Sequence, residues 1–248
     1  MSKVEVTVDE LVAVLQHSNV PTLIAEGRDD IIVLRKMEDK FSNVGLSVLP
    51  AGGRSAVLGV FDRRNELKCT AKTLFFVDKD TWVYGNVPDE YISSDLKLTD
   101  GYSIENDMYQ DGDWESLLRQ NEKANFYRDL DDFISWYALA LYRQIANPNL
   151  SFAHSPEYIL GNGYDMNEFL QLKYGEAYPQ KLYEEIRGNY TKLLRGKALL
   201  ALILRQLSHK KRDPKHSGKS LLEYGASREG ECINRINQWI YNQIDIKS

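Results

Sequence analysis

The stretch TLFFVDKD, residues 73–80, indicates the fold of this 248-residue chain more clearly than any other segment. Its four consecutive apolar residues are typical of a parallel strand that is covered on both faces. Apolar strands are also expected at residues 21–25 and 46–49, with helices at residues 29–41 and 55–65 between the three strands. This alternation predicts an α/β fold in which a parallel sheet is flanked by helices.

The flanking sequence predicts two regions. A capping-box pattern at Thr7 and Glu10 indicates an N-terminal helix, and a fourth, shorter strand is expected within residues 96–106. Further along the chain, apolar residues recur at intervals of three and four, which is typical of amphipathic helices. We therefore predict an α/β domain at residues 1–110 and a mainly helical domain or extension at residues 111–248, packed on the first. The expected helices of the second region are at residues 130–145, 167–172, 190–207 and 228–244.

The overall composition excludes several classes of protein. With 43% hydrophobic residues the chain can form a real core, but it has no apolar run of the roughly 18–20 residues that a membrane span needs. Its polar start lacks the features of a signal peptide, so a cytoplasmic protein without a membrane partner is expected. Cys69 and Cys232 lie far apart and show no zinc-ligand spacing. Both are expected to be reduced thiols.

Charge is distributed unevenly along the chain, although the net charge is only −5. Residues 78–115 contain eleven Asp and Glu against two Lys, whereas residues 187–219 contain ten Lys and Arg against one Asp. An acidic region that holds divalent cations and a basic region that holds phosphates would suit an enzyme acting on phosphodiesters. Two solvated protein faces would give the same pattern.

Three acidic residues are predicted at the carboxyl ends of parallel strands, where ligands bind in open α/β sheets. Glu26 follows the first strand, and Asp78 and Asp80 close the third. If the chain stays extended, Asp78 and Asp80 point the same way and can hold one cation, with Lys79 directed elsewhere. Glu26 could then bind a second metal or act as a general acid or base. A turn and helix cap would explain each motif taken singly.

The combination of Glu26, the Gly-rich PAGGR at residues 50–54 and FFVDKD at residues 75–80 resembles the Toprim domain. This domain is shared by topoisomerases, bacterial primases, OLD-family nucleases and ribosomal RNA-maturing RNases. The resemblance covers about residues 20–110. It implies that Glu26 is the general acid or base and that Asp78 and Asp80 bind Mg²⁺, with Mn²⁺ as an alternative.

Two further motifs are similar to a narrower group. GYSIEN at residues 101–106 and the Gly196-Lys197 pair resemble stand-alone Toprim proteins of bacterial anti-phage defence, including the effectors of PARIS-type systems. This resemblance implies a homodimeric nuclease that cleaves host tRNA. It also implies an ABC-type ATPase sensor partner, of the AriA kind, that holds the effector inactive until it is triggered.

Several residues outside the three carboxylates are candidates for the same chemistry. Glu105 lies in the acidic region and could complete a metal shell, or it could accept hydrogen bonds from loop amides. Lys197 has apolar neighbours on a predicted helix, where it could stabilise the phosphorane charge or simply extend to solvent. The glycines before Arg54 open a predicted helix whose N-terminal amides favour phosphate, although they could serve only the turn.

The basic segment HKKRDPKH, residues 209–216, could contact an RNA backbone or could be an ordinary exposed loop. The predicted substrate-binding residues are Gly52, Gly53, Arg54, Lys210, Lys211 and Arg212.

Three other functions fit part of the pattern. OLD-like cleavage of DNA would use the same carboxylates. A haloacid-dehalogenase-like phosphatase would use Asp78 as nucleophile and Asp80 as acid, but Trp82 stands where that pattern has Thr or Val. An inactive Toprim fold that only binds its ATPase partner would not require Glu26, Asp78 and Asp80 together.

Overall fold

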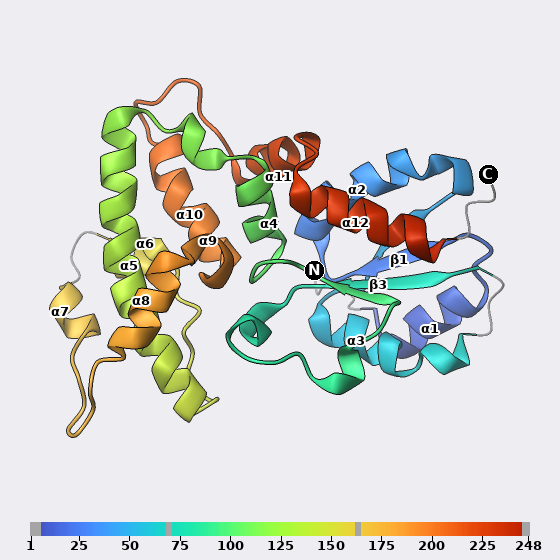
Figure 1. Cartoon of the computed structure of the whole chain (residues 1–248), viewed down its shortest axis with the longest axis horizontal. Coiled ribbons are helices and arrows are strands. Elements are labelled where there is room, and N and C mark those ends of the chain that lie inside the picture. Colours follow the sequence, from blue (N-terminus) through green and yellow to red (C-terminus); the bar gives the residue numbers. More distant parts are fainter. Residues whose placement is uncertain (1–5, 68–70, 162–164, 245–248) are drawn as a thin grey trace. The chain divides into compact units, whose positions relative to one another are not determined.

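The computed structural model describes residues 6–67, 71–161 and 165–244, and Cys69 lies outside these ranges (Figure 1). The chain forms two compact units. The sheet unit contains Met1–Gly112 and Leu221–Ser248, and the helical unit contains Asp113–Ser220. The first division falls close to residue 110, as predicted, but the C-terminal residues belong to the sheet unit rather than to the helical one. In the part of the chain that the structure describes, no helix has the length and apolar character needed to cross a membrane.

Four parallel strands form the sheet in the order β2-β1-β3-β4. Their bounds are β1 (Thr22–Ala25), β2 (Ser47–Pro50), β3 (Thr73–Val77) and β4 (Leu96–Leu98). Ile24 of β1 lies opposite Leu49 of β2 and Phe75 of β3, so the carboxyl ends of these strands reach the same edge. The predicted parallel α/β sheet is confirmed, including its short fourth strand.

Helices cover both faces of the sheet. The helices α1 (Val8–Gln16) and α3 (Arg54–Asp62) lie on one side, and α2 (Arg28–Lys40) and α12 (Glu231–Gln243) lie on the other (Figure 1). Ile24 and Phe75 pack with α1 and α3 in a buried cluster. Because successive side chains of a strand alternate between faces, the buried neighbours Leu23 and Phe76 point toward α2 and α12.

The N-terminal helix begins as its sequence predicts. Thr7 Oγ1 accepts a hydrogen bond from Glu10 N at 3.2 Å, and Glu10 Oε2 accepts one from Thr7 N at 2.8 Å. These reciprocal bonds satisfy two of the amides that a helix start leaves without partners. Leu11 and Leu15 then lie four residues apart on the buried face.

The C-terminal helix α12 is hydrogen-bonded to the rest of the sheet unit at its first turn and again further along the helix. The carboxylate of Asp111, at the end of α4 (Ile104–Asp111), accepts hydrogen bonds from Cys232 N at 3.0 Å and from the next amide at 2.8 Å. Further along α12, Trp239 Nε1 donates to Ser94 O at 2.7 Å. Cys232 is a free, buried thiol whose pKa is raised by burial. These contacts explain why the predicted helix at residues 228–244 joins the sheet unit.

The helical unit is built around the long helix α5 (Gln120–Ala146), and its core includes Phe126, Phe133 and Tyr137. Its other helices are α6 (Pro156–Ile159), α7 (Met166–Phe169), α8 (Gln180–Gly188), α9 (Tyr190–Leu193) and α10 (Gly196–Leu207). The helix α11 (Gly218–Ser227) belongs to the sheet unit from Leu221 onward. The predicted helix at residues 130–145 is part of α5, and the one predicted at residues 190–207 is divided into α9 and α10. Short 3₁₀ helices are η1 (Ser42–Val44), η2 (Arg64–Glu66), η3 (Asp80–Tyr84), η4 (Asp89–Tyr91) and η5 (Trp114–Leu117).

Candidate functional site

Glu26 and Asp78 meet at the carboxyl ends of the neighbouring strands β1 and β3. The amide of Asp78 donates a hydrogen bond to Glu26 Oε1 at 2.8 Å. The turn after β2 joins the same edge, because Gly52 N donates to Glu26 O at 3.0 Å. The sequence predicted that these strand ends coincide, and the geometry confirms it.

Asp78 and Asp80 do not lie in an extended segment, so the prediction that they point the same way along a strand is wrong. β3 ends at Val77, Lys79 is helical with φ −67° and ψ −31°, and Asp80 has φ +48° at the start of η3. The loop after β4 causes this bend. Lys79 N donates to Thr99 Oγ1 at 2.9 Å and Asp80 N donates to Tyr102 O at 2.7 Å.

The side chains of this turn nevertheless find separate partners in the site. Asp78 Oδ1 accepts a hydrogen bond from Ile104 N at 2.9 Å, at the start of α4. Asp80 forms an ion pair with Arg54 at 2.7 Å. Lys79 Nζ donates to Asp100 O at 3.1 Å, so this side chain points elsewhere, as expected.

Five acidic side chains form what we call the carboxylate cluster: Glu26, Asp30, Asp78, Asp80 and Glu105. The other four members all act electrostatically on Asp78. Glu105 is 2% exposed and accepts a hydrogen bond from Ser103 Oγ at 2.5 Å, while Asp30 is 5% exposed and accepts one from Gly27 N at 2.6 Å. Through this bond Asp30 caps the start of α2, and its position one turn after Glu26 also brings it into the cluster.

Two members of the carboxylate cluster have raised pKa values. Burial raises the pKa of Glu26 to about 7; the amide of Asp78 opposes this shift, and the negative charges of Asp30 and Asp80 add to it. Burial also raises the pKa of Asp78 well above its usual value, and repulsion from the four other carboxylates contributes. Crowded carboxylates of this kind favour either protons or a cation.

The donors in the carboxylate cluster fit a hard divalent cation. Carboxylate oxygens suit Mg²⁺ and Mn²⁺, and Mg²⁺ usually takes only one or two carboxylates and fills its shell with water and phosphate oxygens. Across residues 6–67, 71–161 and 165–244, no three or more His, Cys, Asp or Glu side chains are arranged as a ready-made metal cage. The fit therefore rests on donor chemistry and on the raised pKa values.

Arg54 is held at the edge of the carboxylate cluster by several contacts. Besides its bond to Asp80, Nη1 donates to Lys79 O at 3.3 Å, and the guanidinium lies 3.8 Å from the centre of the Trp82 ring. The two glycines before it have backbone φ angles of +96° and +148°, which residues other than glycine rarely adopt. Gly52, Gly53 and Arg54 are thus brought to the site, and the glycine pair is required by the turn.

The other predicted residues belong to the helical unit. Lys197 is exposed in the first turn of α10, and Lys210 and Lys211 are exposed in the loop after it. Arg212 is a correction, because only 5% of it is exposed. Its Nε donates to Glu122 Oε1 at 3.0 Å and its Nη2 donates to Leu117 O at 2.8 Å, so its hydrogen bonds stabilise the fold and do not face RNA.

Comparison with known proteins assigns no family to this chain. It matches neither a protein-family model nor a curated protein. A function must therefore be argued from the fold and from the carboxylate cluster.

Proposed function

We propose that this chain is a Mg²⁺-dependent endoribonuclease of the Toprim type, with Mn²⁺ as an alternative ion. The observation that carries the proposal is the junction of Glu26 and Asp78 at the ends of neighbouring parallel strands, within a cluster that also contains Asp80 and Glu105. Structural packing does not require so many acids at one strand edge, since like charges destabilise one another. The sequence resemblance to Toprim nucleases gives each of these acids a role.

Asp78, Asp80 and Glu105 would hold the ion in this mechanism. When bound, Mg²⁺ would neutralise charge on the phosphate and on the leaving oxygen. Glu26 has a pKa of about 7, so it can both accept and donate a proton near neutral pH. Since the amide of Asp78 holds Glu26 Oε1, proton transfer is assigned to Oε2.

Arg54 would position Asp80 and bind the substrate phosphate. Its Nη1 bonds Asp80 and the Lys79 carbonyl, and Trp82 supports the guanidinium plane. A guanidinium has five N–H donors, so others remain for a phosphate oxygen. Lys210 and Lys211 of the helical unit would contact the RNA backbone, and the role predicted for Lys197 rests on the sequence resemblance alone.

The biological setting follows from the resemblance. The chain would act in the cytoplasm as the toxic effector of an anti-phage, PARIS-type abortive-infection system, like AriB. It would cleave host tRNA as a homodimer after release from an AriA-like, ABC-type ATPase. A phosphatase that uses Asp78 as nucleophile has less support, because Trp82 stands where that pattern has Thr or Val.

Sequencing of RNA ends from cells that express the chain tests this function. The wild type should produce discrete new tRNA ends, and Glu26→Gln and Asp78→Asn should each reduce them by about 100-fold or more. Glu90→Gln is the matched control, because Glu90 is an exposed acid of the same unit. Purified protein should cleave tRNA with Mg²⁺ and stop with excess chelator.

Other outcomes would contradict the proposal in distinct ways. Fragmented DNA without new tRNA ends would indicate an OLD-like DNA nuclease. Full activity of Glu26→Gln together with loss of activity in Asp78→Asn would exclude the proposed role of Glu26. Cleavage that persists in excess chelator would exclude the metal.

A further inference from the structure

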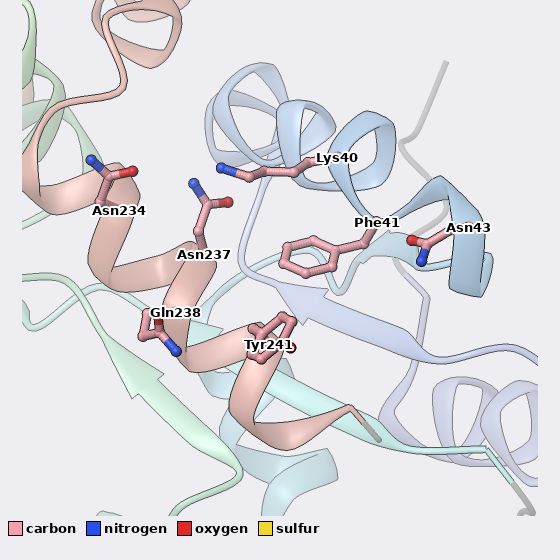
Figure 2. Close-up of a pocket in the computed structure, with 7 residues that line it drawn as sticks. All are labelled: Lys40, Phe41, Asn43, Asn234, Asn237, Gln238 and Tyr241. Atoms are coloured by element: carbon pink, nitrogen blue, oxygen red, sulfur yellow. The ribbon is translucent and has the colours of Figure 1, made fainter. Parts of the chain in front are cut away.

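A pocket lies in the sheet unit, between the C-terminal end of α2 and the helix α12 (Figure 2). Its volume is about 510 Å³, within the range of small-molecule sites. The buried residues Phe41 and Asn237 form its floor, while Lys40 and Tyr241 are exposed at its rim. Figure 2 shows the side chains of Lys40, Phe41 and Asn237 extending from the two helices toward the same space.

The amide of Asn237 is the unusual feature of this pocket. The residue is 7% exposed, and its Oδ1 is buried without a hydrogen-bond partner among the described residues. A buried acceptor of this kind destabilises a fold unless a ligand or water satisfies it. An occupant that carries an N–H or O–H donor would satisfy this acceptor.

Neighbouring amides on α12 do not share this property. Asn234 Nδ2 donates to Glu229 O at 2.8 Å, and Gln238 Nε2 donates to Asn242 Oδ1 at 2.9 Å. Both side chains are exposed, whereas Asn237 is directed inward. The buried amide of Asn237 thus differs from the neighbouring amides, which form ordinary surface hydrogen bonds.

The surroundings of Asn237 select the class of ligand. An asparagine amide can accept a hydrogen bond from the exocyclic amino group of adenine while donating to an adjacent ring nitrogen. Tyr241 is 56% exposed and supplies aromatic surface on which a base can stack. Lys40 places a positive charge at the rim, where a phosphate attached to the base would lie.

We propose that this pocket binds the base of an adenine nucleotide, with Asn237 reading the amino edge of the base. The pocket is distinct from the carboxylate cluster, because Asp30 and Lys40 are ten residues apart on α2, or about 15 Å along its axis. The proposal does not depend on nuclease activity. The adenine can come from a free mononucleotide or from an unpaired adenosine in RNA.

Calorimetric titration of the full chain with AMP and with UMP tests the pocket. AMP should bind, and UMP should bind at least about tenfold more weakly because it lacks the amino donor and offers less area for stacking. Asn237→Leu and Tyr241→Ala should each weaken AMP binding by about tenfold or more. Tyr174→Ala is the matched control, because Tyr174 is a fully exposed tyrosine of the other unit.

Three checks separate loss of binding from loss of the fold or of the proposed nuclease site. Asn237→Leu removes a buried acceptor that has no partner among the described residues, so its melting temperature should be unchanged or raised by about 2–4 °C. Tyr241 is 56% exposed, so Tyr241→Ala should fold normally even if the other variant does not. Asp78→Asn should still bind AMP, which separates this pocket from the proposed nuclease site.

A short single-stranded RNA with one adenosine among uridines distinguishes the two sources. If AMP binds and competes with this RNA, the pocket accepts a free nucleotide. If only the RNA binds, and Asn237→Leu weakens that binding, the base is presented by RNA. Binding of neither probe, or binding that both pocket variants leave unchanged, overturns the proposal.

Discussion

Two groups of acidic side chains, one in each unit, are arranged in opposite ways. In the helical unit, three acids lie beside guanidinium groups, and the pKa of each is lowered. Burial acts against this shift at all three, but hydrogen bonds to the carboxylates and the charge of the neighbouring arginines outweigh it. The pairs are Glu122 with Arg212 at 3.0 Å, Asp131 with Arg187 at 2.5 Å and Glu176 with Arg143 at 2.6 Å. In the carboxylate cluster of the sheet unit, the pKa values of Glu26 and Asp78 are raised instead.

This difference distinguishes acids whose charge is neutralised by an arginine of the fold from acids whose charge is available to a ligand. An acid beside an arginine is already stabilised by the fold and gains little from a further ligand. Acids that repel one another raise the free energy of the folded state. Binding of a cation or proton relieves this repulsion and lowers that free energy. Perturbed acids at the carboxyl edge of a parallel sheet are therefore the better candidates for function.

The largest stability effect is expected from breaking the buried pair in the helical unit. Arg212→Met leaves the Glu122 carboxylate buried without its guanidinium, which should reduce the free energy of unfolding by about 3–5 kcal/mol. Chemical denaturation measures this change. The double variant Arg212→Met with Glu122→Gln should recover most of the loss, and Lys211→Ala should change stability by less than about 0.5 kcal/mol. A stable Arg212→Met single variant would mean that Arg212 is a surface residue after all.

Substitution of Glu26 should change the free energy of unfolding less than Arg212→Met does, and it should increase it. Its pKa is about 7 in the folded state against an ordinary value of 4.5, so the folded state holds the proton to higher pH. Stability of the wild type should therefore fall as pH rises from about 4.5 to about 7, and the cost should persist above pH 7. Glu26→Gln should match the wild type near pH 5 and exceed it by about 2–3 kcal/mol near pH 8, in the presence of chelator. A difference that is equal at both pH values would show that Glu26 is not the titrating group.

Addition of Mg²⁺ should stabilise the sheet unit by relieving the repulsion within the carboxylate cluster. At a tenfold excess over its dissociation constant, an ion that binds only the folded state adds about 1.4 kcal/mol to the free energy of unfolding. The gain should be greater near pH 8 than near pH 5.5, because protonated carboxylates bind cations poorly. Thermal denaturation of the wild type and of Asp78→Asn checks this. An equal gain in both proteins would place the ion elsewhere.

The smallest effect is expected on tRNA binding, when the exposed lysines of the loop after α10 are replaced. Lys210→Ala and Lys211→Ala should each weaken tRNA binding only a few-fold and lower the slope of log affinity against log salt by about 1. Stability should not change, because both side chains are exposed. Lys181→Ala, another exposed lysine of the helical unit, is the control. An unchanged salt slope in both loop variants would remove these residues from the RNA contact.

Much of the fold and the first part of the site were predictable from local patterns. The Thr7 cap, the apolar strands and the helices between them follow from spacings of two to four residues. Parallel strands linked by helices place their carboxyl ends together, so the meeting of Glu26 and Asp78 was also predictable. The Asp78–Asp80 geometry was predicted wrongly because residues 99 and 102 bend that turn through hydrogen bonds that no local pattern shows.

Local sequence patterns define the order of strands and helices along the chain, the strand edge at which the acids gather and the residue types available there. Which charges pair depends on the tertiary structure, since Arg212 meets Glu122 from 90 residues away. It also decided that α12 returns to the sheet unit and that Asn237 faces a pocket shared with Phe41. The physical reason is that local preferences arise within a few residues, whereas pairing and burial depend on segments that only folding brings together.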